Sequence, residues 1–193
     1  MAHDACVKAV ALRDGTELPD PLAIALGFVE AYGVETPLPP EQADSFGEAD
    51  LRRANRGGAR ISAAEIAAVL ERRARIERAL RSIAPDASLA AGAVPWRPLA
   101  DLFAAFADIR GIGFAKTTKT LHPKRPALIP ILDSVLQAYV AEGEDAMALV
   151  RAYKHDLDTN RRALRDVQRE LARNGHRLTE VRILDMLIWS VKT

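Results

Sequence analysis

A Gly-Ile-Gly turn between two helical segments is the feature that most constrains how this chain folds. Leu102, Phe103 and Phe106 have the spacing of one helix face, which predicts a helix over residues 99–109. A second, short helix is predicted over residues 114–121. Gly111 can take the positive φ that reverses a chain within two residues, while Gly113 clears side-chain bulk from the backbone. The two glycines therefore predict a tight turn, with the side chain between them joining the two helices.

The remaining amphipathic segments also have helical periodicity. A capping box at 62–65 precedes an amphipathic pattern over 66–83, and Asn174-Gly175 ends another helix. Asp20 is the predicted cap of a helix over 21–32, and Phe28 lies on its apolar face. Further helices are predicted after Asp133, over 161–173 and over 179–191. Proline- or small-residue-rich connectors occupy 34–47 and 85–95. Because no alternating strand pattern is found, we predict an all-α helical bundle, with residues 1–193 as a single domain.

Composition excludes several classes of protein. The single cysteine, Cys6, excludes an internal disulfide framework and a four-cysteine cluster. The four histidines are scattered, so we expect neither a metal site nor a cofactor. No apolar run approaches the ~20 residues of a membrane span, and the N-terminal residues lack the pattern of a signal peptide. We therefore expect a cytoplasmic protein that does not enter membranes.

Charge is unevenly distributed along the chain. The formal net charge is only +1, but the first fifty residues are strongly acidic and the remainder is basic. Residues 109–132 contain five Lys or Arg residues and His122, without one Asp or Glu. Such a chain can present a basic face while staying nearly neutral overall. Its acidic segment, 1–50, is expected to pack on the helical domain or to flank it.

This acid-free window predicts a site for phosphate groups. Backbone amides of the turn and the N-terminus of the helix that follows can bind an anion, and neighbouring cations add to the attraction. The residues predicted to contact DNA are Arg110, Gly111, Ile112, Gly113, Lys116, Lys119, Lys124 and Arg125. A lone carboxylate, Asp133, follows the window and is predicted to cap the next helix. A P-loop is excluded because its four-residue spacer is missing.

The words IRGIGFAKT and IPILDSVL, with this spacing between glycines and aspartate, resemble the helix-hairpin-helix DNA glycosylase superfamily. The resemblance is closest to the adenine-removing branch and covers about residues 109–140. It implies that the hairpin, within 99–121, holds a phosphate of double-stranded DNA. It also implies that Asp133, in the loop and helix 122–141, is the catalytic carboxylate, which stabilises a cationic sugar or activates water.

One departure from the family pattern limits the chemistry that the resemblance implies. Bifunctional members have a nucleophilic lysine two residues after the second glycine, where this chain has Ala115. Lys116 is one position later, which on a helix is a rotation of about 100°. The resemblance therefore implies a monofunctional glycosylase that uses water. Trp96, Trp189, Phe103 and Phe106 are interpreted as core residues, so no base pocket is assigned from the sequence.

Two other functions fit the same residues. The protein could keep the fold as a catalytically inactive DNA-binding or partner-binding module, in which Asp133 only caps a helix. Alternatively, the acidic first fifty residues could cover the basic face, so that the turn no longer meets nucleic acid.

Overall fold

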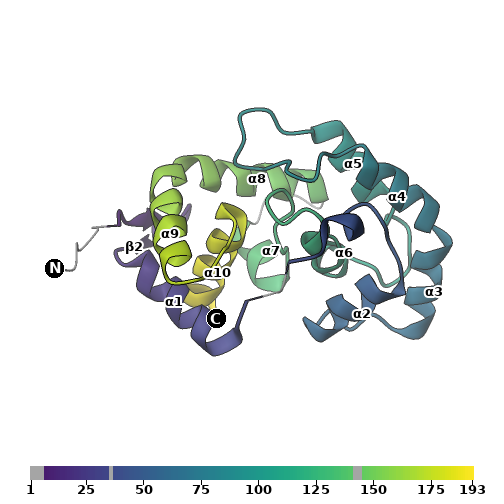
Figure 1. Cartoon of the computed structure of the whole chain (residues 1–193), viewed down its shortest axis with the longest axis horizontal. Helices are drawn as coiled ribbons and strands as arrows, with labels where there is room; N and C mark the ends of the chain where they lie inside the picture. The colour runs from purple at the N-terminus through teal and green to yellow at the C-terminus, as the bar shows by residue number, and fades with distance from the viewer. Residues whose placement is uncertain (1–6, 35–36, 141–144) are drawn as a thin grey trace.

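The computed structural model describes residues 7–34, 37–140 and 145–193. They form ten α-helices, two short 3-10 helices and one two-stranded antiparallel sheet (Figure 1). The prediction of an all-α fold is confirmed, apart from this small sheet of β1 (Val10–Ala11) and β2 (Glu17–Leu18). None of the helices in these ranges is both long and apolar enough to cross a membrane.

One group of helices is centred on the C-terminal helix. It occupies the left of Figure 1 and consists of α1 (Pro21–Tyr32), α7 (Ser134–Val140), α8 (Ala146–Thr159), α9 (Arg161–Arg173) and α10 (Glu180–Lys192). Helix α10 packs against the other four helices, and these contacts bury almost all of its apolar side chains. The β-hairpin is attached to this group through Asn160, whose side-chain amide exchanges two 2.8 Å hydrogen bonds with the backbone of Ala11.

The second group lies on the right of Figure 1. It consists of α2 (Glu48–Arg56), α3 (Ala63–Glu71), α4 (Arg73–Arg81), α5 (Trp96–Ala104) and α6 (Phe114–Leu121). Helix α2 packs on α6, and α4 packs on α5. The 3-10 helices η1 (Pro40–Gln42) and η2 (His122–Lys124) flank this group.

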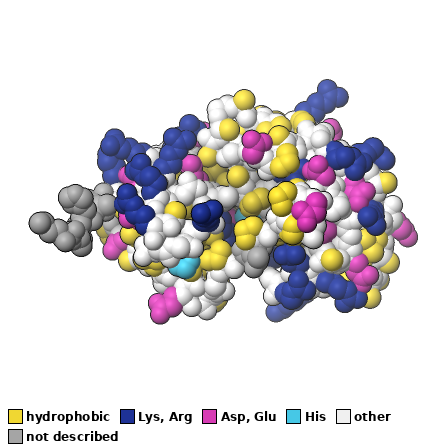
Figure 2. Space-filling model, viewed as in Figure 1, with side chains coloured by type: hydrophobic (Ala, Val, Ile, Leu, Met, Phe, Trp, Pro, Cys, Tyr) yellow, Lys and Arg dark blue, Asp and Glu magenta, His cyan; other side chains and the backbone are white. Residues whose placement is uncertain are grey.

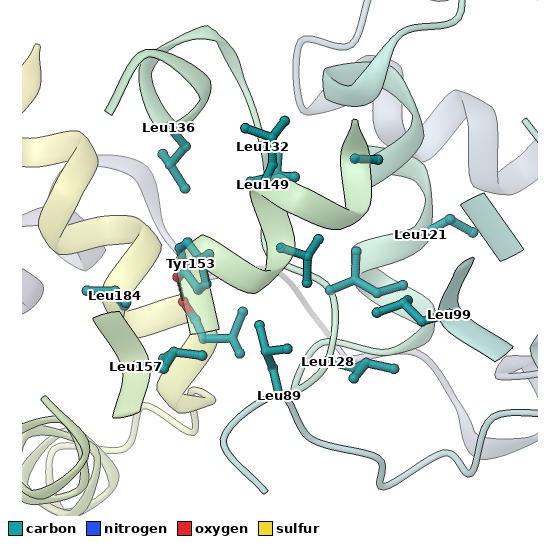
Figure 3. Close-up of a cluster of buried hydrophobic side chains, with 14 of the residues drawn as sticks. Leu89, Leu99, Leu121, Leu128, Leu132, Leu136, Leu149, Tyr153, Leu157 and Leu184 are labelled. Carbon is teal, nitrogen blue, oxygen red and sulfur yellow. Dashed lines mark hydrogen bonds between the residues drawn. The ribbon is translucent and has the colours of Figure 1, made fainter. Parts of the chain in front are cut away.

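A continuous hydrophobic core joins the two groups. Leu121 and Leu128 lie toward the second group, while Leu136, Tyr153 and Leu184 lie toward the first (Figure 3). The segment between α6 and α7, which begins with η2 and a turn, passes through this core, and Leu128, Ile129 and Leu132 are completely buried in it. Since this segment carries Asp133 at its end, the core fixes where that carboxylate lies.

Several helix boundaries agree with the local signals in the sequence. Asp20 caps α1 by accepting a hydrogen bond from the Ala23 amide, and Ser62 with Glu65 forms the predicted capping box of α3. The single helix predicted over 66–83 is wrong, because the backbone tightens at Arg72. Its amide bonds to the carbonyl of Val69, which is a 3-10 contact, and a new helix begins at residue 73.

Helices α2 and α8 and the small sheet were not predicted. Helix α2 is rich in arginine and has few apolar residues, of which Leu51 and Ala54 are buried, so little in its sequence indicates a helix that faces the core. The two strands have two residues each, too few for an alternating pattern. Residue 141, the last of the predicted acid-bearing segment, lies outside the described residues, as does Cys6.

Candidate functional site

The Gly-Ile-Gly turn has the predicted backbone conformation and is locked to helix α3. Gly111 has φ +84°, and a Cβ there would lie 2.1 Å from Oε1 of Glu65. The same carboxylate accepts hydrogen bonds from Lys116 at 2.7 and 2.8 Å, which lowers the pKa of Glu65. Ile112 packs against the hydrophobic core. The turn is thus a structural joint, and the charge of Lys116 is already balanced within the chain.

Lys124 and Arg125 are interior residues, which corrects their predicted place on a DNA-binding surface. The Lys124 side chain is 1% exposed and pairs with Asp50 at 2.7 Å. The Arg125 side chain is 0% exposed and pairs with Asp44 at 2.6 Å. Neither cation is presented to a phosphate, because burial of a charge requires partners within the fold. Both acids belong to the first fifty residues, so this segment neutralises part of the basic window.

Arg125 satisfies backbone carbonyls at the end of helix α4. Its guanidinium donates to the carbonyls of Leu80 and Ile83, and also to those of Ala43 and Lys124. The last carbonyls of a helix have no partner within the helix, so a buried donor is needed there. Arg125 therefore connects α4, the loop after η1 and the end of η2.

A cleft of about 650 Å³ opens between the two helical groups. One side is formed by α1 and α10, the other by α2 and α6, and the segment before α7 closes it. Among the predicted residues, the structure brings Lys119 and Asp133 together in this cleft. Arg110 is exposed and does not line it, and the same is true of Gly111 and Gly113.

Cations from α2 line one side of the cleft. Arg53 and Arg56 join Lys119, whose ammonium donates to the carbonyl of Gly57 at 3.1 Å. Lys and Arg side chains gather over α2 at the lower right of Figure 2. Nε of Arg53 is buried without a hydrogen-bond acceptor among the described residues. We call Arg53, Arg56 and Lys119 the basic rim; only Lys119 was predicted, because α2 itself was not.

Aromatic side chains form the opposite wall. Trp189 lies edge-on to Phe28 and Tyr32, with ring centroids 5.6 and 5.2 Å apart. All three line the cleft, and Tyr32 is 65% exposed. Trp189, interpreted as a core residue, is half-buried: it packs against the core and also lines the cleft. Phe103 and Phe106 are buried in the core as predicted. Trp189 and Phe28 both have the helical spacing of core residues. The sequence pattern therefore could not show that they line a cleft.

Two carboxyl groups line the cleft. Oδ1 of Asp133 accepts hydrogen bonds from the amides of Val135 and Leu136 at 3.0 and 3.1 Å, which confirms its capping role. Asp185 on α10 is only 2% exposed, and its Oδ2 accepts from the Ile131 amide at 3.1 Å. Burial raises the pKa of Asp185 to about 7, and the charge of Asp133 contributes in the same direction.

The backbone that carries Asp133 is held on both sides. The Leu132 amide donates to Oγ1 of Thr118 on α6 at 3.0 Å, while Asp185 binds the preceding amide from α10. Gln137 donates to the Leu132 carbonyl at 2.7 Å. Asp133 is thus positioned by both helical groups. Among the described residues, no three His, Cys, Asp or Glu side chains are grouped as metal ligands.

The fold and cleft define an all-α protein with a carboxylate pair between an aromatic wall and a basic rim. Residues 30–192 match the model of a family described as "Family of unknown function (DUF6308)". Because the match covers most of the chain, this protein belongs to that family. Comparisons with curated proteins and with solved structures gave no match.

Proposed function

We propose that this protein binds double-stranded DNA and acts as a monofunctional, glycosylase-like enzyme that removes a damaged or mispaired base. The observation that carries the proposal is the position of Asp133 in a cleft that also contains aromatic rings and a basic rim. The resemblance of residues 109–140 to the helix-hairpin-helix glycosylases supports the same function. The cleft supplies three of the features such chemistry needs: a carboxylate, a stacking surface and cations.

Each wall of the cleft has a distinct task in this proposal. A base that leaves the duplex stacks against Trp189 and its aromatic neighbours, since every base offers a π-face. The flanking phosphates lie against the basic rim, whose three cationic side chains line the cleft. A sugar between the two walls then lies beside Asp133, whose negative charge stabilises an oxocarbenium-like sugar.

The side chains around the turn favour hydrolysis by water over Schiff-base chemistry. Position 115 is alanine, and Lys116 is bound to both oxygens of Glu65. An amine must be free to attack a sugar, whereas the Lys116 amine is held by the Glu65 carboxylate. Asp133 therefore acts by orienting a water and accepting its proton as the base departs.

A non-catalytic module is the second candidate. It is favoured by the two hydrogen bonds that Oδ1 of Asp133 accepts from the first turn of α7, because capping alone explains an aspartate there. Such a module would bind duplex through the basic rim without responding to positive charge on the sugar. The two candidate functions therefore give Asp133 different roles, but both use the basic rim to bind duplex.

Loss of the basic rim is expected to weaken duplex binding. For the double variant Arg56→Gln/Lys119→Gln we expect a fall in affinity of about tenfold at low salt and a salt slope smaller by about two, because two phosphate contacts are lost. Fluorescence anisotropy with a labelled duplex at two salt concentrations measures both quantities.

The control removes the same charge elsewhere. Arg75 on α4 and Arg162 on α9 are exposed and do not line the cleft. The variant Arg75→Gln/Arg162→Gln should therefore keep most of the affinity. Equal losses in both double variants would show that only net charge matters, and binding of the natural chain that does not respond to salt would contradict a DNA function.

A further inference from the structure

The buried carboxyl group of Asp185 has one oxygen without a partner. Its Oδ2 accepts from the Ile131 amide, while Oδ1 has no hydrogen-bond partner among the residues that the structure describes. Buried polar atoms are almost always satisfied, so an orphan oxygen on a residue that lines a cleft indicates a ligand or a proton-transfer role. Among the described residues that line the cleft, only this oxygen and Nε of Arg53 are buried without a hydrogen-bond partner.

The groups around Asp185 come from three elements. Arg182, on the same helix, favours the charged carboxylate, and so do the Ile131 amide and the nearby Tyr153 hydroxyl. The negative charge of Asp133 opposes it. The Tyr153 hydroxyl, from α8, donates to the carbonyl of Val181 at 2.7 Å. Burial outweighs the favourable contacts, so the pKa of Asp185 is raised to about 7 and about half of the molecules keep its proton at pH 7.

We propose that Asp185 is a second carboxyl group of the site, which holds a proton in the empty cleft and releases it when positive charge develops beside Asp133. This inference rests on the proposed glycosylase-like function. Positive charge near the pair favours two ionised carboxylates over one, so binding of a cation and loss of the proton are thermodynamically coupled. The ligand class is therefore a sugar, or a sugar mimic, that carries positive charge.

In the reaction the released proton goes to the departing base. As the bond between C1′ of the sugar and the base nitrogen breaks, its electron pair moves to that nitrogen, which takes the proton of Asp185. Water then adds to C1′ and gives a proton to Asp133. The products are the neutral base and a sugar with a hydroxyl at C1′. One proton passes from Asp133 to solvent, one returns to Asp185, and no other reactant is needed.

Proton release on binding tests the inference without a known lesion. The probe is a duplex with a cationic abasic-sugar mimic, titrated calorimetrically at pH 7 in buffers of different ionisation enthalpy. Since Asp185 has a pKa of about 7, the natural chain should release about half a proton more than Asp185→Asn. A duplex with a neutral abasic analogue should give no difference between the two chains.

A second measurement separates failure of this inference from failure of the proposed function. Carbon-13 NMR of aspartate carboxyls, with the signal of Asp185 identified by its absence in Asp185→Asn, should show titration near neutral pH. Its midpoint should be lower in Asp133→Asn, because a neighbouring negative charge is removed. The role of Asp185 alone would be overturned if the chain preferred the cationic duplex without the extra proton release. It would also be overturned if the NMR signal showed an Asp185 carboxyl group that stays ionised throughout pH 5–8. No preference for the cation would overturn the proposed function, and the proton-donor role with it.

Discussion

Replacing Arg125 with methionine should destabilise the protein more than any other single change considered for it. The side chain is completely buried, and its guanidinium donates to four backbone carbonyls and to Asp44. Methionine fills much of the volume but leaves those carbonyls without donors. We expect a loss of about 3–5 kcal/mol in the free energy of unfolding, which urea denaturation followed by circular dichroism measures.

Two further variants make this test specific. Arg125→Lys keeps the charge but loses the planar fork, so its loss should be intermediate. Arg110, from the same acid-free window, is exposed, and Arg110→Met should change stability by less than about 0.5 kcal/mol. Similar stabilities for Arg125→Met and Arg110→Met would contradict the assignment of Arg125 to the interior.

Asp185→Asn should stabilise the protein, and increasingly so as pH rises. The pKa of Asp185 is raised from 3.8 to about 7, so the native state binds more protons than the unfolded state between these values. The natural chain therefore loses stability as pH increases through this window, by up to about 4 kcal/mol. Asparagine is neutral at every pH and its oxygen can still accept from the Ile131 amide.

Urea denaturation at pH 4, 6 and 8 measures the difference between the two chains. It should be small at pH 4 and reach about 2–4 kcal/mol in favour of Asp185→Asn at pH 8. Asp86 is exposed, and Asp86→Asn should show no such trend. If the stability difference between Asp185→Asn and the natural chain stayed constant with pH, or shifted toward the natural chain from pH 4 to pH 8, a buried acid with a raised pKa would be contradicted. A carboxyl group that destabilises its own fold is typical of a functional site.

Local signals in the sequence predicted the elements that depend on neighbouring residues. The cap at Asp20, the capping box at Ser62 and the cap at Asp133 each require only the next few residues. Gly111 was predicted for the same reason, since a positive φ is a property of one position. These signals placed most helices and one carboxylate of the cleft.

Properties that arise from distant contacts could not be predicted in this way. Lys124 and Arg125 have the sequence context of surface cations, but they pair with acids 74 and 81 positions earlier in the chain. Trp189 has the spacing of a core residue, yet its neighbours on α1 leave it at the edge of a cleft. Arg53 belongs to a helix with few apolar residues, which the sequence did not identify. Whether such residues are buried depends on which helices pack together, which local patterns do not specify.

The central claim is that Asp133 faces the sugar of a bound duplex as a catalytic carboxylate. The most direct measurement is the affinity for a duplex with a cationic abasic-sugar mimic, relative to a neutral abasic analogue, for the natural chain and for Asp133→Asn. Asparagine also caps helices well, so the variant should keep its fold. We predict a preference for the cation of about tenfold or more in the natural chain, as expected for opposite charges in a partly buried site, and none in the variant. Equal affinities in the natural chain, or a preference that survives in Asp133→Asn, would contradict the account.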